Sequence, residues 1–301
     1  MLTDYHADDY GLSMNNAIRM MQLLEAAKLD SISIIPNMSV FENTMEYLDL
    51  KWNTLEKKPL ISIHLNIADG FSLSGIDDGF FTHKSQTAPG RFIFHTSWGR
   101  LLFTSYNPLK RNKVRALLTK EFKEQIKTVY DRLPADINFD KQLRLDSHTH
   151  THMIPVVFDA MLDAVDGLDL KDRLSFVRVS AEPILPFNKI KGTYPKINLV
   201  KNIILNLLSF RAERILKKRG VSYELMWGLI MSGKMDKERI GSLMPAMKTI
   251  AENKGLSLEI LCHPGIILPN EQCEEFSKDD KGFFASENRN VEYEAAMCVD
   301  R

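Results

Sequence analysis

The stretch KQLRLDSHTHTHMIPVVFDAMLDAVDGL (residues 141–168) contains the unit from which the fold is built, a strand followed by a helix. Its first part, KQLRLDS (141–147), predicts a short strand. PVVFDAMLDAVDGL (155–168) predicts a helix, and Pro155 suits its start because the first turn of a helix leaves backbone N–H groups unpaired. Repeated strand-then-helix units are typical of a parallel sheet with helical crossovers.

Strand and helix patterns alternate along the rest of the chain. Apolar runs predict further strands over residues 2–7, 31–36, 59–67, 174–180, 223–230 and 256–262. Helical spacing predicts helices that follow Ser13, that cover 41–52 and 111–133, and that run from Asp236 to Gly255. At least six or seven such units in one chain predict an α/β fold, an irregular (β/α) barrel of parallel strands with helical crossovers.

The chain is expected to form a single domain over residues 1–301. Its 301 residues are 44% hydrophobic, which is enough for a substantial core, and no linker or repeat divides them. Residues 69–110 interrupt the alternation with glycines, polar residues and a cluster of aromatic residues, so we expect an inserted loop or lid there. The aromatic rings could stack on sugar faces, but packing of the loop onto the barrel is the preferred interpretation.

Composition excludes several classes of protein. The formal net charge is zero, so no global field would hold a nucleic acid. The three cysteines, Cys262, Cys273 and Cys298, are too few and too scattered for a disulfide framework, which fits a cytoplasmic protein. The polar, acidic start is no signal peptide, and no run of 18 apolar residues predicts a transmembrane segment.

Residues 186–219 form a basic and partly amphipathic segment. Such a segment can lie on an anionic membrane surface. The preferred interpretation is a helix that packs on the barrel or forms a contact in a homodimer.

Residues that carry chemistry follow four of the apolar strands: Asp8 and Asp9, His64, Asp146 with His148, His150 and His152, and His263. Each motif alone has a structural explanation, as a solvated turn or as a hydrogen-bonded histidine of the core. Parallel strands of an α/β barrel, however, bring their carboxyl ends together on one face. We therefore expect the four motifs to meet at one site.

Asp9, His64 and His148 would supply one carboxylate and two imidazoles to a divalent cation, leaving positions for water and substrate. If the strand frays after Ser147, His148 is the histidine best placed to turn inward. Asp8 would then be free to act as a base, and Asp146 is expected to orient a ligand without binding the metal itself. The roles of His150 and His152, near the ligands or the substrate, stay open.

Four motifs, in this order, resemble those of the YdjC-like carbohydrate deacetylases (ChbG/HpnK type): ADDYGLS (7–13), HLN (64–66), DSHTHTHMIP (146–155) and CHPG (262–265). The resemblance covers the chain from Ala7 to about Gly265 and is less clear over the C-terminal tail, 266–301. It implies a distorted β/α barrel of the glycoside hydrolase/deacetylase type. The segment 69–110 lies where substrate loops of the family vary, so the resemblance does not name the sugar.

The resemblance also implies an activity, the metal-dependent removal of N-acetyl groups from acetylated carbohydrates such as chitooligosaccharides. By position, Asp8 falls on the presumed base and His263 on a histidine that serves as the acid. The family metal is usually described as magnesium, while two imidazole ligands would also suit zinc.

Two other functions remain open from the sequence. One is a different metal-dependent hydrolase, a phosphoesterase or a non-sugar amidohydrolase. A phosphate substrate favours arginines near the site, and Arg144 and Arg178 lie in strands from which they could point inward. The other is a catalytically decayed protein that binds a sugar or a metal without turnover.

Overall fold

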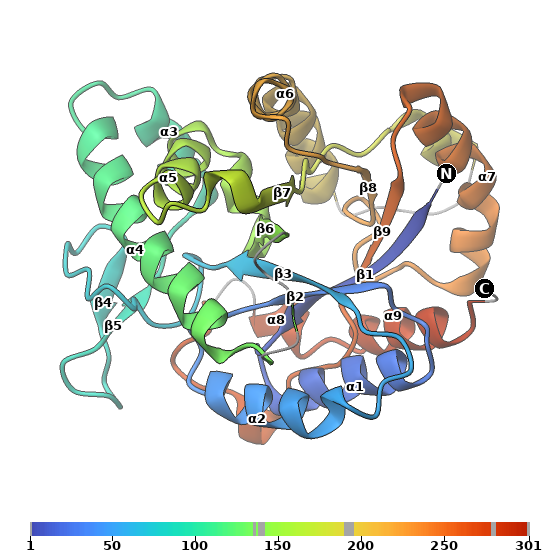
Figure 1. Cartoon of the computed structure of the whole chain (residues 1–301), viewed down its shortest axis with the longest axis horizontal. Coiled ribbons are helices and arrows are strands. Elements are labelled where there is room, and N and C mark those ends of the chain that lie inside the picture. Colours follow the sequence, from blue (N-terminus) through green and yellow to red (C-terminus); the bar gives the residue numbers. More distant parts are fainter. Residues whose placement is uncertain (1, 135–136, 138–141, 190–195, 278–280, 300–301) are drawn as a thin grey trace.

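The computed structural model describes residues 2–134, 137, 142–189, 196–277 and 281–299. Seven parallel strands form one sheet in the order β7-β6-β3-β2-β1-β9-β8 (Figure 1). Their bounds are β1 Thr3–Tyr10, β2 Ser31–Ile34, β3 Leu60–Leu65, β6 Leu143–Ser147, β7 Leu174–Val177, β8 Leu225–Trp227 and β9 Leu258–Cys262. A two-stranded antiparallel hairpin, β4 Thr82–Lys84 with β5 Phe92–Phe94, stands apart from this sheet.

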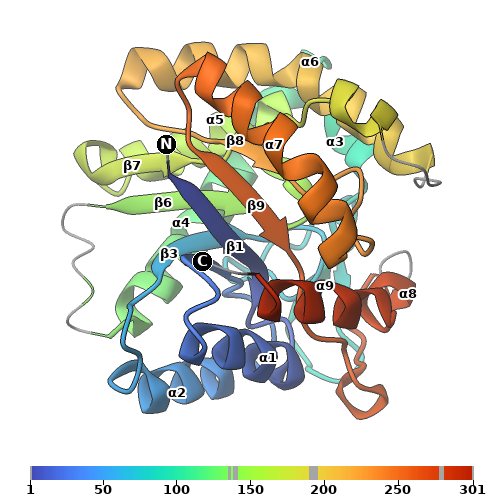
Figure 2. The same ribbon diagram turned by 90° about the vertical axis from the view of Figure 1, so that its right-hand side faces the viewer.

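Helices connect the strands and surround the curled sheet, with α1 and α2 on one side and α6 and α7 on the other (Figures 1 and 2). Their bounds are α1 Met14–Glu25, α2 Phe41–Trp52, α3 Trp98–Ser105, α4 Arg111–Arg132, α5 Pro155–Asp166, α6 Lys196–Arg219, α7 Lys237–Lys254, α8 Lys281–Phe284 and α9 Asn288–Met297. No helix among the described residues is long and apolar enough to cross a membrane.

The sheet curls until its two edges approach each other. Phe176 of β7 forms an isolated parallel bridge with Ser222, three residues before β8. The N–H of Val177 donates to the carbonyl of Ser222 at 3.1 Å, so a short contact joins the edge strands. This confirms the predicted irregular barrel, and it gathers the carboxyl ends of the strands on one face.

Several local predictions are confirmed. The Ser13 hydroxyl caps α1 by accepting from the N–H of Asn16, Pro155 is the first residue of α5, and Asp236 caps α7. Helix α7 ends at Gly255, which has φ +65°, a conformation that glycine adopts without steric cost. The strands predicted over 174–180 and 223–230 are shorter in the structure, as β7 and β8 show.

The segment 69–110 has secondary structure of its own, the β4–β5 hairpin and helix α3. Phe71, Phe81 and Phe94 are buried there, which agrees with packing of the segment onto the barrel. Trp227, in β8, is fully buried in the core. Residue 141 of the predicted strand and residues 190–195 of the basic segment lie outside the described residues.

Candidate metal centre

Asp8 and Asp9 both reach the interior of the barrel although they are neighbours in a strand. Side chains of successive strand residues normally point to opposite faces. Here the pairing of β1 with β2 is irregular between Ala7 and Tyr10, and Asp9 has φ +78°. This local departure from strand geometry turns both carboxylates toward the ends of the other strands.

Asp9, His64 and His148 meet as the sequence predicted. One ligand atom from each lies within 4.8 Å of the other two, and all three residues are buried. The Asp9 Oδ1 atom is 2.8 Å from His148 Nδ1 and 3.5 Å from His64 Nε2. These residues come from β1, β3 and the end of β6, so the candidate ligand group depends on the closure of the sheet.

The three alternating histidines do not continue as a strand. Residues His148–Met153 form a 3-10 segment in which Thr149 and His150 have φ values of +52° and +60°. His148 therefore turns toward Asp9, while the other two histidines have different partners. His150 Nδ1 is 2.9 Å from the Ser180 hydroxyl, and His152 lies between the Ser147 hydroxyl and the Arg178 carbonyl.

His150 and His152 are neutral in the fold. Burial lowers the pKa of His150 well below its ordinary value, and the charges of Lys201 and Arg178 add to this effect. Burial lowers the pKa of His152 to about 4. Both ring nitrogens of His152 contact protein groups and so hold the loop in place, whereas His150 lines the cavity beside the candidate centre.

Each of the two candidate histidine ligands has a further carboxylate beside it. Asp146 Oδ1 is 2.7 Å from His64 Nδ1, the orienting contact expected from the sequence. Asp69 Oδ2 is 3.3 Å from His148 Nε2, yet neither atom has a hydrogen-bond partner among the described residues. Buried polar atoms without partners, beside two imidazoles and a carboxylate, fit a site built for a cation.

The carboxylates hold protons on the two histidine ligands. Burial lowers the pKa of His64, but Asp8 and Asp146 outweigh it and raise the pKa to about 9. Burial also lowers the pKa of His148, but Asp9 and Asp69 outweigh it and raise this pKa to about 10. At neutral pH two imidazolium groups therefore stand where a divalent cation would bind.

We expect metal binding to release close to two protons at neutral pH. A protonated imidazole cannot ligate, so the affinity falls as the pH falls, by roughly 100-fold per unit when two protons are displaced. Because both pKa values lie above neutrality, this dependence persists up to about pH 9, whereas ordinary histidines would lose it above about 7. Calorimetry in two buffers of different ionisation enthalpy measures the release. Metal binding without proton release at pH 8 would contradict the expectation.

Asp146→Asn is expected to weaken metal binding about 10- to 100-fold, the usual effect of removing a carboxylate that orients a histidine ligand. His64 would lose the partner of its Nδ1 atom and its fixed ring orientation. Competition with a chelator measures the affinity. Asp163→Asn on α5 is the control and should bind metal like the wild type, because it removes a half-buried carboxylate that pairs with Arg115 and lies outside the cavity at the candidate centre.

Asp8 is paired with a buried arginine instead of standing free. Arg178 donates to both oxygens of Asp8, at 2.8 and 2.9 Å, and its Nη2 atom is 3.1 Å from Asp146. Burial raises the pKa of Asp8, but the charges of Arg178 and His64 outweigh it and hold the pKa well below its ordinary value. Asp8, Asp146 and His6 also lie within ligand distance of one another, but the guanidinium already supplies a cation there.

The C-terminal tail contributes two buried side chains. Arg289 of α9 donates from Nη2 to Asp9 Oδ2 at 3.0 Å, whereas the other oxygen of Asp9 faces His64 and His148. Glu292, one turn later, accepts from the backbone N–H of His263 at 2.7 Å and lies 3.3 Å from its Nδ1 atom. The tail thus fixes Asp9 and His263, although the sequence resemblance is weakest over these residues.

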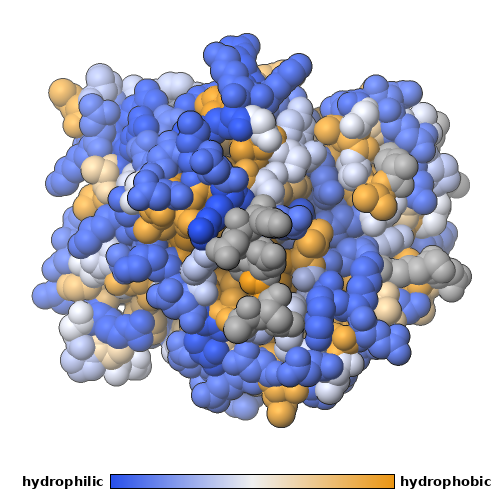
Figure 3. Space-filling view, in the orientation of Figure 1, coloured by the Kyte–Doolittle hydropathy of each residue, from blue (hydrophilic) through white to orange (hydrophobic). Residues whose placement is uncertain are grey.

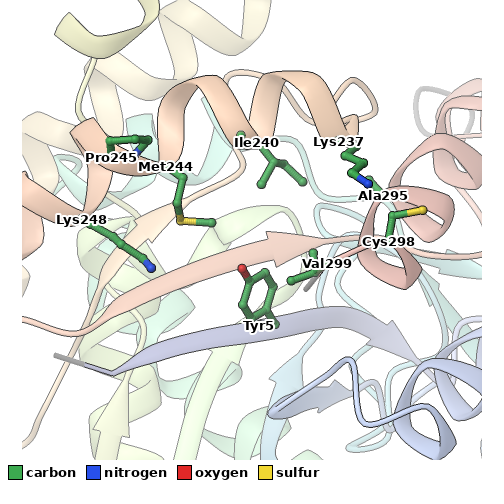
Figure 4. Close-up of a pocket in the computed structure, with 10 residues that line it drawn as sticks. Tyr5, Lys237, Ile240, Met244, Pro245, Lys248, Ala295, Cys298 and Val299 are labelled. Atoms are coloured by element: carbon green, nitrogen blue, oxygen red, sulfur yellow. The ribbon is translucent and has the colours of Figure 1, made fainter. Parts of the chain in front are cut away.

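A cavity of about 370 Å³ opens onto the centre. Asp146 and His152 do not line this cavity. The other predicted site residues do, namely Asp8, Asp9, His64, His148, His150 and His263. A second cavity, of about 500 Å³, lies between β1, α7 and the end of the chain (Figure 4). No carboxylate or imidazole of the described residues lines that second cavity, so it lacks the ligands that the candidate metal centre has.

Sequence reasoning missed His6, Asp69, Arg289 and Glu292. His6 and Asp8 are two residues apart in β1, so strand alternation places them on the same face. Their contact, 3.0 Å between His6 Nε2 and Asp8 Oδ1, could therefore have been predicted. The spacing of Arg289 and Glu292 places them on one helix face, but nothing in the sequence pairs that helix with β1 and β9. Asp69 follows β3 by a loop whose path no local pattern specifies.

Comparison with known proteins supports one family. A family profile described as YdjC-like protein matches residues 5–298. A solved structure titled as a putative cellobiose-phosphate cleavage protein from Enterococcus faecalis V583 matches with a TM-score of 0.51 and 16% identity. The match covers 99% of this chain and 96% of that one, and at this identity it supports the fold alone. A search of curated proteins finds no match.

Proposed function

The chain belongs to the YdjC-like family, and from this membership and its buried centre we propose that it is a metal-dependent hydrolase that removes N-acetyl groups from acetylated carbohydrates. The observation that carries the proposal is the convergence of Asp9, His64 and His148 beside the cavity that Asp8 and His263 also line. One carboxylate and two imidazoles at an accessible site are typical of hydrolytic metal centres.

Asp9, His64 and His148 would hold a divalent cation, with magnesium favoured by the family resemblance and zinc by the two imidazoles. Such a cation polarises an amide carbonyl and lowers the pKa of water. Arg289 holds the second oxygen of Asp9, which leaves the first oxygen to face both histidines.

Asp8 would accept the proton of the attacking water. Its carboxylate lines the cavity and is held in place by Arg178, so it is positioned and ionised before substrate arrives. The low pKa that Arg178 imposes makes Asp8 a weaker base, so we propose that it acts on water that the cation has already made more acidic.

His263 would give a proton to the leaving amine, because an amine anion is a very poor leaving group. Its side chain is 13% exposed and lines the same cavity as Asp8. Glu292 contacts the Nδ1 atom, which orients the ring and leaves Nε2 as the nitrogen available to the cavity. An acid and a base that reach one cavity from different strands can act on opposite sides of the amide bond.

A phosphoesterase receives less support. Arg144 stacks on Phe176 at 3.9 Å and approaches Asp4, and Arg178 is enclosed by Asp8, Asp146 and Glu259. Neither arginine is among the residues that line the cavity at the metal centre. Among the described residues, the lining of the cavity therefore lacks the arginine fork that commonly binds a phosphate.

The test is acetate release from defined N-acetylglucosamine oligomers by protein reconstituted with Mg²⁺ or with Zn²⁺. Acetate release in at least one arm, abolished by a chelator and restored by the metal, would support the proposal. A protein that binds metal but releases no acetate from a broad panel of acetylated sugars would refute it. Parallel assays with phosphate esters would identify the alternative hydrolase.

A further inference from the structure

Helix α6 exposes a stripe of large apolar side chains. Val200, Ile203, Leu207 and Phe210 are 52%, 48%, 67% and 68% exposed. Their spacing of three, four and three residues keeps them on one face of the helix. Apolar side chains this exposed are common singly, but a row of four on one helix face indicates a surface that contacts something.

The opposite face of α6 packs against the barrel. Leu205, Ala212 and Leu216 are buried, and Asn202 donates to the carbonyl of Glu182 at 3.1 Å. The residue Lys201 lines the cavity at the metal centre. The exposed stripe is therefore not needed to hold the helix in place, and it lies on the far side of a helix that borders the cavity.

The stripe continues into a cationic end. Arg214, Lys217 and Lys218 are exposed and follow Phe210 at helical spacing. In the part of the chain that the structure describes, these three form no ion pair, whereas Arg211 and Arg219 on the flank pair with Asp159 and Asp166 of α5. The exposed face of α6 thus combines an apolar row with unneutralised positive charge.

A second group of exposed apolar side chains lies nearby. Phe103, Tyr106 and Leu109, in and after α3, are 73%, 71% and 92% exposed. Asp159 accepts from both Arg111 and Arg211, which ties the start of α4 to the middle of α6. Helices α3 and α6 stand in the upper part of both ribbon views, and hydrophobic and hydrophilic surface adjoin at α6 in Figure 3.

We propose that the exposed face of α6 docks the protein on the surface of an anionic lipid bilayer. An apolar row beside lysines and arginines matches an interface with an apolar layer under negative headgroups. Since no described helix can cross a membrane, the docking is peripheral. A second copy fits less well, because pairing two copies antiparallel through residues 200–210 would cover the apolar row but would offer no negative charge to Arg214, Lys217 and Lys218.

Co-sedimentation with vesicles tests the proposal. The full chain should bind phosphatidylcholine vesicles that contain phosphatidylglycerol more strongly than pure phosphatidylcholine vesicles, and high salt should weaken the binding. Leu207→Glu should reduce binding at least about tenfold, because it puts a charge into the apolar row. Lys217→Gln with Lys218→Gln should cost about fivefold for each charge removed.

Leu50→Glu is the matched control. Leu50 is 73% exposed on α2, close to the 67% of Leu207, and α2 lies on the opposite side of the molecule (Figures 1 and 2). This variant should bind vesicles like the wild type, and both variants should melt at the wild-type temperature. Absence of binding to anionic vesicles at low salt, or equal binding by Leu207→Glu, would overturn the proposal. A dimer in sedimentation velocity that Leu207→Glu splits would overturn it too, in favour of self-association.

Discussion

Asp9→Asn is expected to lose its bound metal and at least about 10³-fold of its deacetylase rate, because a metal centre supplies several kcal/mol of transition-state stabilisation and each 1.4 kcal/mol is about tenfold. Asparagine retains the shape of the side chain and tolerates the φ of +78° that Asp9 adopts, whereas alanine would add backbone strain. The substitution removes the negative charge that faces His64 and His148. Metal content and acetate release measure the two losses.

Asp169→Asn is the matched control for this variant. Asp169 has φ +57° and is exposed on the loop after α5, so the same substitution is made in a similar backbone conformation away from the cavity. The control should retain metal and activity. Asp9→Asn also removes the carboxylate that pairs with the buried Arg289, so circular dichroism must show that the variant is folded at the assay temperature. A folded variant that retains full metal content would contradict the assignment of Asp9 as a ligand.

The convergence of the candidate site was predictable from strand order alone. Asp9 and His64 lie at the carboxyl ends of β1 and β3, His148 directly follows β6, and the carboxyl ends of parallel strands share one face. The type of each residue then indicated a cation site. The contact between Asp146 and His64 agrees with the expected orienting role of Asp146, and the structure adds that the two residues are paired in neighbouring strands.

The direction of individual side chains was not predictable. Strand alternation would place His148, His150 and His152 on one face, but the left-handed conformations of Thr149 and His150 break that pattern. A tight turn at β-branched and aromatic residues is imposed by tertiary contacts, among them the hydrogen bond from the Trp98 indole to the Thr149 carbonyl at 3.0 Å. Local sequence propensity does not predict a contact between residues so far apart in the chain.

The electrostatic partners of the site were also hidden, because they come from distant segments. The sequence offered Arg178 only as a residue that could face the site of a phosphoesterase, and its pairing with Asp8 is a contact over 170 positions. Arg289 lies 280 positions from Asp9. Single-sequence patterns report periodicity over a few turns, so they predict which residues share a face of one element but not which elements face each other.

Asp8→Asn is expected to retain the metal and to lose about 10²- to 10⁴-fold in rate, the usual contribution of a general base. The amide cannot accept the proton of water, but it preserves the volume of the side chain. Arg178 retains its contacts with Asp146 and Glu259, so the buried guanidinium is still paired. Metal content, kcat and KM for acetate release are the measurements, and kcat should carry the loss.

Asp4→Asn provides the matched control, because Asp4 is a buried carboxylate of the same strand and lies outside the cavity at the metal centre. It should leave the rate and the metal content unchanged. The two variants then distinguish the roles of Asp8 and Asp9. Asp9→Asn should lose both metal and rate, whereas Asp8→Asn should lose rate alone. Full activity of a metal-loaded Asp8→Asn variant would show that Asp8 serves only as the counter-ion of Arg178, and another group would have to accept the proton.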